Sequence, residues 1–173
     1  MSQKPDHRAI ASWACYDFAN TIFSMNVISL YFALWVTVDH GGQDILYSGA
    51  LSISMIAVAV SVPIFGVISD QTGRRRFPLA FLTIMSVFAT VLIGQTNQLW
   101  IGLLLFIIAN YCYQSALVFY NGMLPNVARR SSVGIVSGYG VSLGYLGSIV
   151  GLLVVEPFVT NGGRSAAFLP TGI

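Results

Sequence analysis

One acidic side chain, Asp17, lies inside a long apolar stretch that begins at Ile10. An unpaired charge within a membrane is unfavourable by roughly 3 kcal/mol on insertion scales, so such an acid should face the interior of a helix bundle. Asn20, Thr21 and Ser24 share its helical face at i+3, i+4 and i+7 spacing. This polar stripe predicts either a cavity that binds a cationic group or carries a proton, or a structural hydrogen bond to a neighbouring helix, and both interpretations stay open.

A second polar group lies in a later apolar stretch and comprises Asn110, Tyr113 and Gln114. Their spacing of three and four residues places them mostly on one helical face. We expect Asn110 and Gln114 to line the same cavity as the stripe around Asp17. Tyr120 and Asn121 follow one or two turns later. We expect Tyr120 to anchor the helix end, because tyrosine favours membrane interfaces.

Other chemistry is absent from the sequence. It contains no nucleophile–base pair, nucleotide-binding loop or metal-ligand set. Cys15 and Cys112 fall in apolar runs, where a thiol behaves as a small hydrophobe. The eight basic residues are too few and too dispersed to follow a nucleic-acid backbone. The sequence therefore predicts a protein that is not an enzyme, needs no cofactor or metal and binds no nucleic acid.

The elements that must position these side chains are membrane-spanning helices. Of the 173 residues, 55% are hydrophobic and only 8% are charged, whereas a soluble domain carries roughly 25% charge. Glu156 and Pro157 should end the last span. The predicted spans are residues 10–38, 45–69, 78–94, 99–121 and 134–155, preceded by a polar lead at 1–9 and followed at 156–173 by an outer loop and the start of a truncated sixth helix.

The basic residues indicate the orientation of these spans. Short cytoplasmic loops carry an excess of Lys and Arg. On one side of the predicted spans lie Lys4, Arg8, Arg74, Arg75, Arg76, Arg129 and Arg130, and only Arg164 lies on the other. The sequence thus predicts an integral protein of the cell (inner or plasma) membrane with a cytoplasmic N-terminus.

The fifth span carries a face of small residues. Gly140, Gly144, Gly147 and Gly151 repeat at four, three and four residues. Because lipid tails are as apolar as leucine, membrane helices associate through close packing, which small residues permit. We expect this face to be a helix-contact surface.

The segment between the second and third spans, residues 66–76, reads GVISDQTGRRR. Gly73 provides the permissive backbone of a tight turn, and Gly66 allows a neighbouring helix to approach. Asp70 can pair with an arginine. Three arginines alone would be only an orientation signal.

This segment resembles the signature loop of the major facilitator superfamily, on the matching positions Gly66, Asp70, Gly73, Arg74, Arg75 and Arg76. Gln71 departs from the usual basic residue. The resemblance implies a cytoplasmic latch that is made and broken as two halves rock, with Asp70 and Arg74 as gating residues.

Three further segments are similar to the vacuolar-effluxer-like branch of that superfamily, which includes fungal vacuolar amino-acid effluxers and many bacterial members. They are SWACYDFAN (12–20), YNGMLP (120–125) and SGYGVSLGYLG (137–147). They fall in the first, fourth and fifth spans, in the order that the family has.

The predicted fold is an all-α membrane protein with five transmembrane helices and the start of a sixth, the N-terminal half-bundle of a major-facilitator fold. The function that the resemblance implies is part of a secondary transporter of a small solute, with amino acids as the family's example. Its partners would be the lipid bilayer, a small-molecule substrate and a C-terminal half or second chain. The alternative is a small non-transporting scaffold that assembles through its glycine face.

Overall fold

The computed structural model describes residues 7–128 and 132–172. These residues form helices joined by short turns, without a strand among them. The elements are α1 (His7–Phe23), η1 (Ser24–Tyr31), α2 (Phe32–Leu34), η2 (Trp35–Asp39), α3 (Asp44–Thr72), α4 (Arg76–Gln95), α5 (Leu99–Val127), α6 (Val133–Gly162), η3 (Arg164–Ala167) and α7 (Phe168–Gly172). In the part of the chain that the structure describes, five helices are long and apolar enough to cross a membrane, so the predicted all-α fold with five spans is confirmed.

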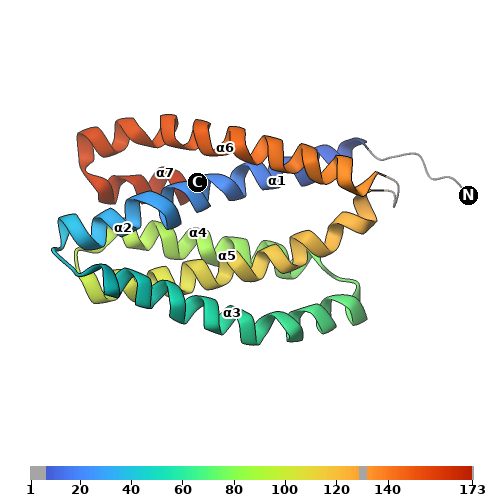
Figure 1. Ribbon diagram of the computed structural model, residues 1–173, viewed down its shortest axis with the longest axis horizontal. Helices are drawn as coiled ribbons and strands as arrows, with labels where there is room; N and C mark the ends of the chain where they lie inside the picture. Colours follow the sequence, from blue (N-terminus) through green and yellow to red (C-terminus); the bar gives the residue numbers. More distant parts are fainter. Residues whose placement is uncertain (1–6, 129–131, 173) are drawn as a thin grey trace, which may run out of the picture.

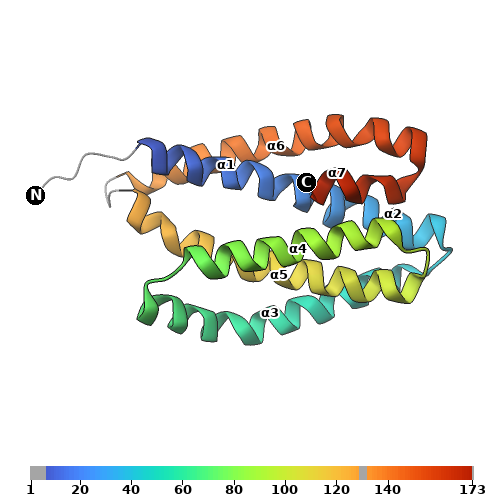
Figure 2. The same cartoon turned by 180° about the vertical axis from the view of Figure 1, so that it is seen from behind.

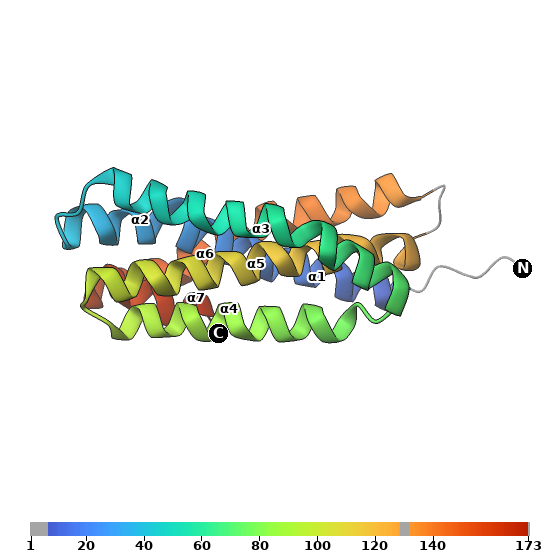
Figure 3. The same ribbon diagram turned by 90° about the horizontal axis from the view of Figure 1, so that it is seen from below.

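The long helices run side by side along one axis (Figure 1). The start of α1, the turn between α3 and α4, the last turn of α5 and the first turn of α6 lie at one end, and the turns between η2 and α3, α4 and α5, and α6 and η3 lie at the other (Figures 1 and 3). Arg8 and Arg74–Arg76 belong to the first end and Arg164 to the second, as the charge count requires. Lys4, Arg129 and Arg130 lie outside the described residues.

The first span is one continuous rod from α1 to η2 in which two stretches, η1 and η2, are π-helical. In lipid, backbone N–H and C=O groups must find hydrogen-bond partners within the protein, and a continuous helix provides these partners along its own length. The Ser29 hydroxyl donates to the Ser24 carbonyl at 3.1 Å, which adds a side-chain bond inside the wider π-turn. Short π-segments within helices are frequent at functional sites.

The helices extend beyond the predicted spans. We expected a loop at residues 70–77, but α3 continues to Thr72 and α4 begins at Arg76. We also expected Pro157 to end the last span, yet α6 runs on to Gly162. Beyond Pro157 the helix gains side-chain bonds, because Thr160 donates to the Glu156 carbonyl and Asn161 donates to the Pro157 carbonyl at 3.1 and 2.8 Å.

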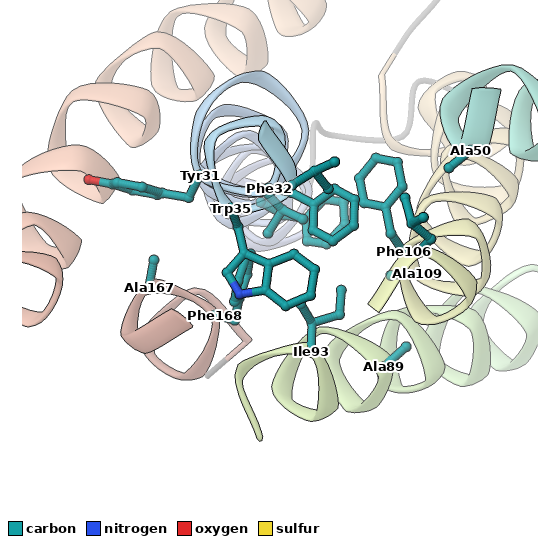
Figure 4. Packing of buried hydrophobic residues seen from close by; sticks show 14 of the residues in the cluster. Tyr31, Phe32, Trp35, Ala50, Ala89, Ile93, Phe106, Ala109, Ala167 and Phe168 are labelled. Atoms are coloured by element: carbon teal, nitrogen blue, oxygen red, sulfur yellow. The ribbon is translucent and has the colours of Figure 1, made fainter. Parts of the chain in front are cut away.

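An aromatic core, whose packing Figure 4 shows, fills the bundle at the end opposite the start of α1. The Phe32 and Phe106 rings stack with centroids 4.1 Å apart, and Phe168 meets Trp35 edge-on. Gly102 of α5 lies against Trp35, since a Cβ there would come within 2.4 Å of the indole. This core holds the first rod, α5 and the returning segment η3–α7 together, and α7 points back along the bundle (Figure 2).

Candidate functional site

Two aromatic side chains from the first and fourth spans form a reciprocal contact near the N-terminal end of the bundle. Trp13 of α1 and Tyr120 of α5 stack with centroids 4.6 Å apart and planes 8° from parallel. The Trp13 indole donates to the Tyr120 carbonyl at 3.4 Å, and the Tyr120 hydroxyl donates to the Trp13 carbonyl at 3.1 Å. Both side chains are buried. The first two family-like segments therefore meet here.

The third family-like segment packs against the same place. A Cβ at Gly140 of α6 would lie 2.5 Å from the Trp13 ring. One at Gly144 would lie 2.8 Å from the Thr21 hydroxyl and 3.1 Å from the Asp17 carboxylate. Because Gly140 and Gly144 lack a side chain, Trp13, Asp17 and Thr21 of α1 can pack directly against the backbone of α6.

The rest of the glycine face continues along α1. A Cβ at Gly147 would meet the Phe18 carbonyl oxygen at 2.4 Å, and one at Gly151 would meet Ile22 at 2.9 Å. All four glycines predicted to pack helices are buried against this one helix. The face is accordingly occupied within the chain.

Asp17 is half-buried at the centre of this arrangement. Its carboxylate lies beside the Tyr120 hydroxyl and next to Gly144. The Thr21 hydroxyl donates to the Asp17 carbonyl at 2.8 Å. Tyr120 was expected only to anchor a helix end, but it is 3% exposed and contacts the acid. The sequence did hold one indication that Tyr120 does more than anchor a helix end, because it lies in the family-like segment 120–125.

Asn20 and Ser24, on the other side of the predicted stripe, face α5 instead. The Asn20 amide donates to the Tyr113 hydroxyl at 3.4 Å, and Ser24 reaches the same hydroxyl. The four-residue stripe therefore divides, with Asp17 and Thr21 toward α6 and the other two toward Tyr113.

A cavity of about 270 Å³ lies between α1, α4, α5 and α7. Asn20 and Tyr113 line it, together with four hydroxyl-bearing residues that were not among the predicted site residues: Tyr16, Thr83, Ser86 and Thr171. The hydroxyls of Tyr16 and Thr83 lie 2.9 Å apart and bridge α1 to α4. The third span carries three hydroxyl residues, Thr83, Ser86 and Thr90. The first two line the cavity, so these hydroxyls were the sequence signal that could have indicated the contribution of α4.

Asn110 and Gln114 do not line this cavity. Asn110 is fully buried and donates to the Ser54 hydroxyl at 2.7 Å, which in turn donates to the Leu51 carbonyl. It joins α5 to α3 rather than to α1. Gln114 is half-buried.

The turn after α3 is closed by one arginine. Gly73 ends the helix in a left-handed conformation with φ +63°, and its amide donates to the Ser69 carbonyl. Arg75 then donates to the Ser69 hydroxyl and the Asp70 carboxylate, both at 2.8 Å, and to the Gly122 carbonyl of α5. We refer to Ser69, Asp70, Arg75 and Gly122 as the Arg75 clasp.

The resemblance had implied Asp70 and Arg74 as the gating residues, whereas the structure pairs Asp70 with Arg75. Arg74 and Arg76 are exposed. Gly66 was expected to admit a neighbouring helix, but among the described residues no other helix comes within 4 Å of a Cβ built there.

Comparison with known proteins places the chain among membrane transporters of one family. Residues 45–134 match the family model described as "Vacuole effluxer Atg22 like". An uncharacterized protein of Aquifex aeolicus is 31% identical over 143 residues, which are 82% of this chain and 36% of that protein. The "Uncharacterized MFS-type transporter YxiO" of Bacillus subtilis is 30% identical over 152 residues, 83% of this chain and 36% of that protein.

A plant relative belongs to the same group of matches. The "High affinity nitrate transporter 2.7" of Arabidopsis thaliana is 31% identical over 142 residues, 78% of this chain and 28% of that protein. The chain thus spans about a third of the length of these curated relatives. No solved structure gives a significant match.

Proposed function

The chain belongs to the vacuole effluxer Atg22-like family of the major facilitator superfamily, and from this premise we propose that it forms the first half-bundle of a secondary transporter. Such a transporter moves a small solute by exposing one site alternately to the two sides of the membrane. The observation that carries the proposal is the convergence of three distant segments on Asp17, where α5 supplies Tyr120 and α6 supplies Gly144. An intramembrane acid held by several helices is a functional site by default.

The substrate that suits this site is a small polar solute with a cationic group, such as an amino acid. Asp17 does not line the cavity but supplies a negative charge on the same helix, and Asn20, Tyr113, Tyr16 and Thr83 supply uncharged hydrogen-bonding groups in the cavity lining. No residue that lines the described cavity carries a positive charge. A nitrate ion, as in the plant relative's name, would find no cationic group there.

The packing supports a rocking motion of the half-bundle as one body. The Arg75 clasp ties the α3–α4 turn to α5, and the glycine face ties α6 to α1. The Trp13–Tyr120 contact links these two groups of helices. A bundle joined in this way can transmit a movement at the cytosolic end to Asp17.

The scaffold alternative depended on a glycine face that is free to bind another protein. That face is buried against α1. Nothing else among the described residues favours a purely structural role, so we do not advance this second function.

The test is solute flux in proteoliposomes that contain the chain together with its completing half. We expect uptake of at least one amino acid from a panel that also includes nitrate. Asp17→Asn should reduce this flux at least tenfold or remove its dependence on a proton gradient. The control is Asp44→Asn, which removes an exposed acid at the opposite end of the bundle.

Three results would count against the proposal. Flux through the isolated 173-residue chain would contradict its role as a half. Unchanged flux and proton dependence in Asp17→Asn would remove Asp17 from the mechanism. Transport of nitrate but of no amino acid would contradict the substrate class.

A further inference from the structure

His40 follows directly after the first membrane span, at the end of the bundle opposite the start of α1 (Figure 1). Its Nδ1 lies 3.0 Å from the carbonyl oxygen of Trp35, and its Nε2 lies 3.0 Å from the carbonyl oxygen of Asn97. Trp35 belongs to η2, whereas Asn97 lies in the turn between α4 and α5. We refer to these three residues as the His40 bridge. It joins the end of the first span to a turn that lies 57 residues further along the chain.

The two contacts of the His40 ring determine how many protons the ring needs. A backbone carbonyl only accepts hydrogen bonds, so both ring nitrogens must donate. A neutral imidazole has one N–H donor and one lone pair, and only the doubly protonated imidazolium has two donors. A neutral His40 would therefore make one of the two bonds and direct a lone pair at the other carbonyl oxygen.

Two further features favour a positive charge on this ring. The His40 ring lies against the Trp35 indole, with ring centroids 4.0 Å apart, and the π-system of an indole attracts a nearby cation. His40 also caps the C-terminal end of the first rod, where its backbone amide donates to the Trp35 carbonyl at 3.2 Å. The helix dipole stabilises cationic side chains at such an end.

The charged groups that face His40 are one acid and one base. Asp39 of η2 and Arg164 of η3 line the same cavity as His40, and they form an ion pair with each other. Their opposite charges therefore largely offset each other at the ring. Asp44 of α3 and Glu156 of α6 are the neighbouring acids along the chain, and neither lines this cavity. Among the described residues, the two carbonyl oxygens thus decide which form of the ring fits.

We propose that His40 is a proton-binding site that holds the α4–α5 turn to the end of the first span. With a proton on each nitrogen the ring donates to both carbonyls, and loss of one proton breaks one of these bonds. The ring is half-buried, and histidine changes its charge between about pH 5 and pH 8. This site is separate from Asp17 and does not depend on the proposed transport function.

The alternative is a neutral His40 that donates from one nitrogen and has a purely structural role. Its contribution to stability would not change across the pH range in which histidine titrates. A proton-binding His40 instead stabilises the bundle at low pH, where the cation makes both bonds. It loses part of that effect as the pH rises and the ring becomes neutral, so the two interpretations differ in the pH dependence of unfolding.

The first experiment measures thermal unfolding midpoints of the purified, untagged chain in detergent at about pH 5.5 and about pH 8. It compares His40→Gln with His7→Gln, the matched control that removes the other histidine of the sequence. Between the two pH values the midpoint of His7→Gln should fall by about 2–4 °C more than that of His40→Gln, because only His7→Gln retains the bond that depends on the proton. An equal or smaller fall in His7→Gln would overturn the proton-binding site.

The second experiment observes the protons directly and leaves His40 unchanged. In His7→Gln with ¹⁵N-labelled histidine, the ring signals come from His40 alone. Free histidine is roughly one quarter imidazolium at about pH 7. At the same pH we expect about half or more of His40 to show the ¹⁵N shifts of a ring protonated on both nitrogens. A fraction no larger than that of free histidine would overturn the proposal, even if His40→Gln fails to fold.

Discussion

Trp13 and Tyr120 join α1 to α5 in both directions, since each side chain donates a hydrogen bond to the backbone carbonyl of the other residue. Either side chain can turn only by breaking its own hydrogen bond and the ring stacking. Asp17, one turn further along α1, lies beside the Tyr120 hydroxyl. The contact therefore fixes the position of the helix that carries the half-buried Asp17.

Replacement of Tyr120 by Phe tests this contact. The variant keeps the stacked ring and removes the hydroxyl that donates to Trp13, so we expect a loss of about 1 kcal/mol in the free energy of unfolding. The measurement is thermal or SDS unfolding in detergent micelles. Tyr111→Phe is the control, because it removes another α5 hydroxyl bond, to Ser61 at 2.9 Å, from a half-buried ring. A larger loss in Tyr111→Phe than in Tyr120→Phe would contradict the assignment.

The Arg75 clasp predicts unequal effects within one short turn. Arg75→Gln removes charge-assisted bonds to two helices, so we expect it to destabilise the chain by about 1.5–3 kcal/mol. Asp70→Asn should lose less than about 1 kcal/mol, because the Asp70 side chain is 76% exposed and exposed ion pairs contribute little. Arg74→Gln should stay within about 0.5 kcal/mol of wild type.

The order of destabilisation is measured by comparing the unfolding midpoints of these three variants in one detergent. If Arg74→Gln were the most destabilising, the Arg75 clasp would be wrong and Arg74 would be the arginine that holds this turn.

The number and type of the helices could be predicted because apolar runs of this length leave the backbone only one way to satisfy its hydrogen bonds in lipid. The identity of neighbouring helices could not. Asn20 and Thr21 are adjacent in sequence, yet one contacts Tyr113 of α5 and the other lies against Gly144 of α6. Helical spacing defines a face about 100° wide, and that width is enough to span two neighbours.

Which arginine forms the clasp could not be predicted from the sequence either. Spacing alone treats positions 74 and 75 as equivalent within a basic turn. The choice depends on where α3 ends: Gly73 takes up a left-handed conformation directly after Thr72, and this turn directs Arg75 back to Ser69. Tyr120 was misplaced for a related reason, because an interfacial tyrosine and a buried one have the same local sequence pattern.

The orientation predicted from the basic residues can be measured by cysteine labelling. Gln71 and Gln98 are exposed at opposite ends of the bundle, and each is replaced by Cys in a chain that lacks Cys15 and Cys112. A membrane-impermeant maleimide should label position 98 in intact cells and position 71 only after permeabilisation, since short basic loops stay in the cytoplasm. Labelling of position 71 from outside would reverse the topology and with it the cytosolic location of the Arg75 clasp.

The glycine face of α6 gives the sharpest packing prediction. A Cβ at Gly147 would lie 2.4 Å from the carbonyl oxygen of Phe18, which is backbone and cannot rotate away. Gly147→Ala should therefore push α6 from α1 and lower the free energy of unfolding by about 1–3 kcal/mol. Gly138→Ala, on the same helix, meets nothing within 4 Å and should be neutral or stabilising by up to about 1 kcal/mol, because alanine is the better helix former. Equal stability of the two variants, measured by unfolding in detergent, would mean that α1 does not occupy this face.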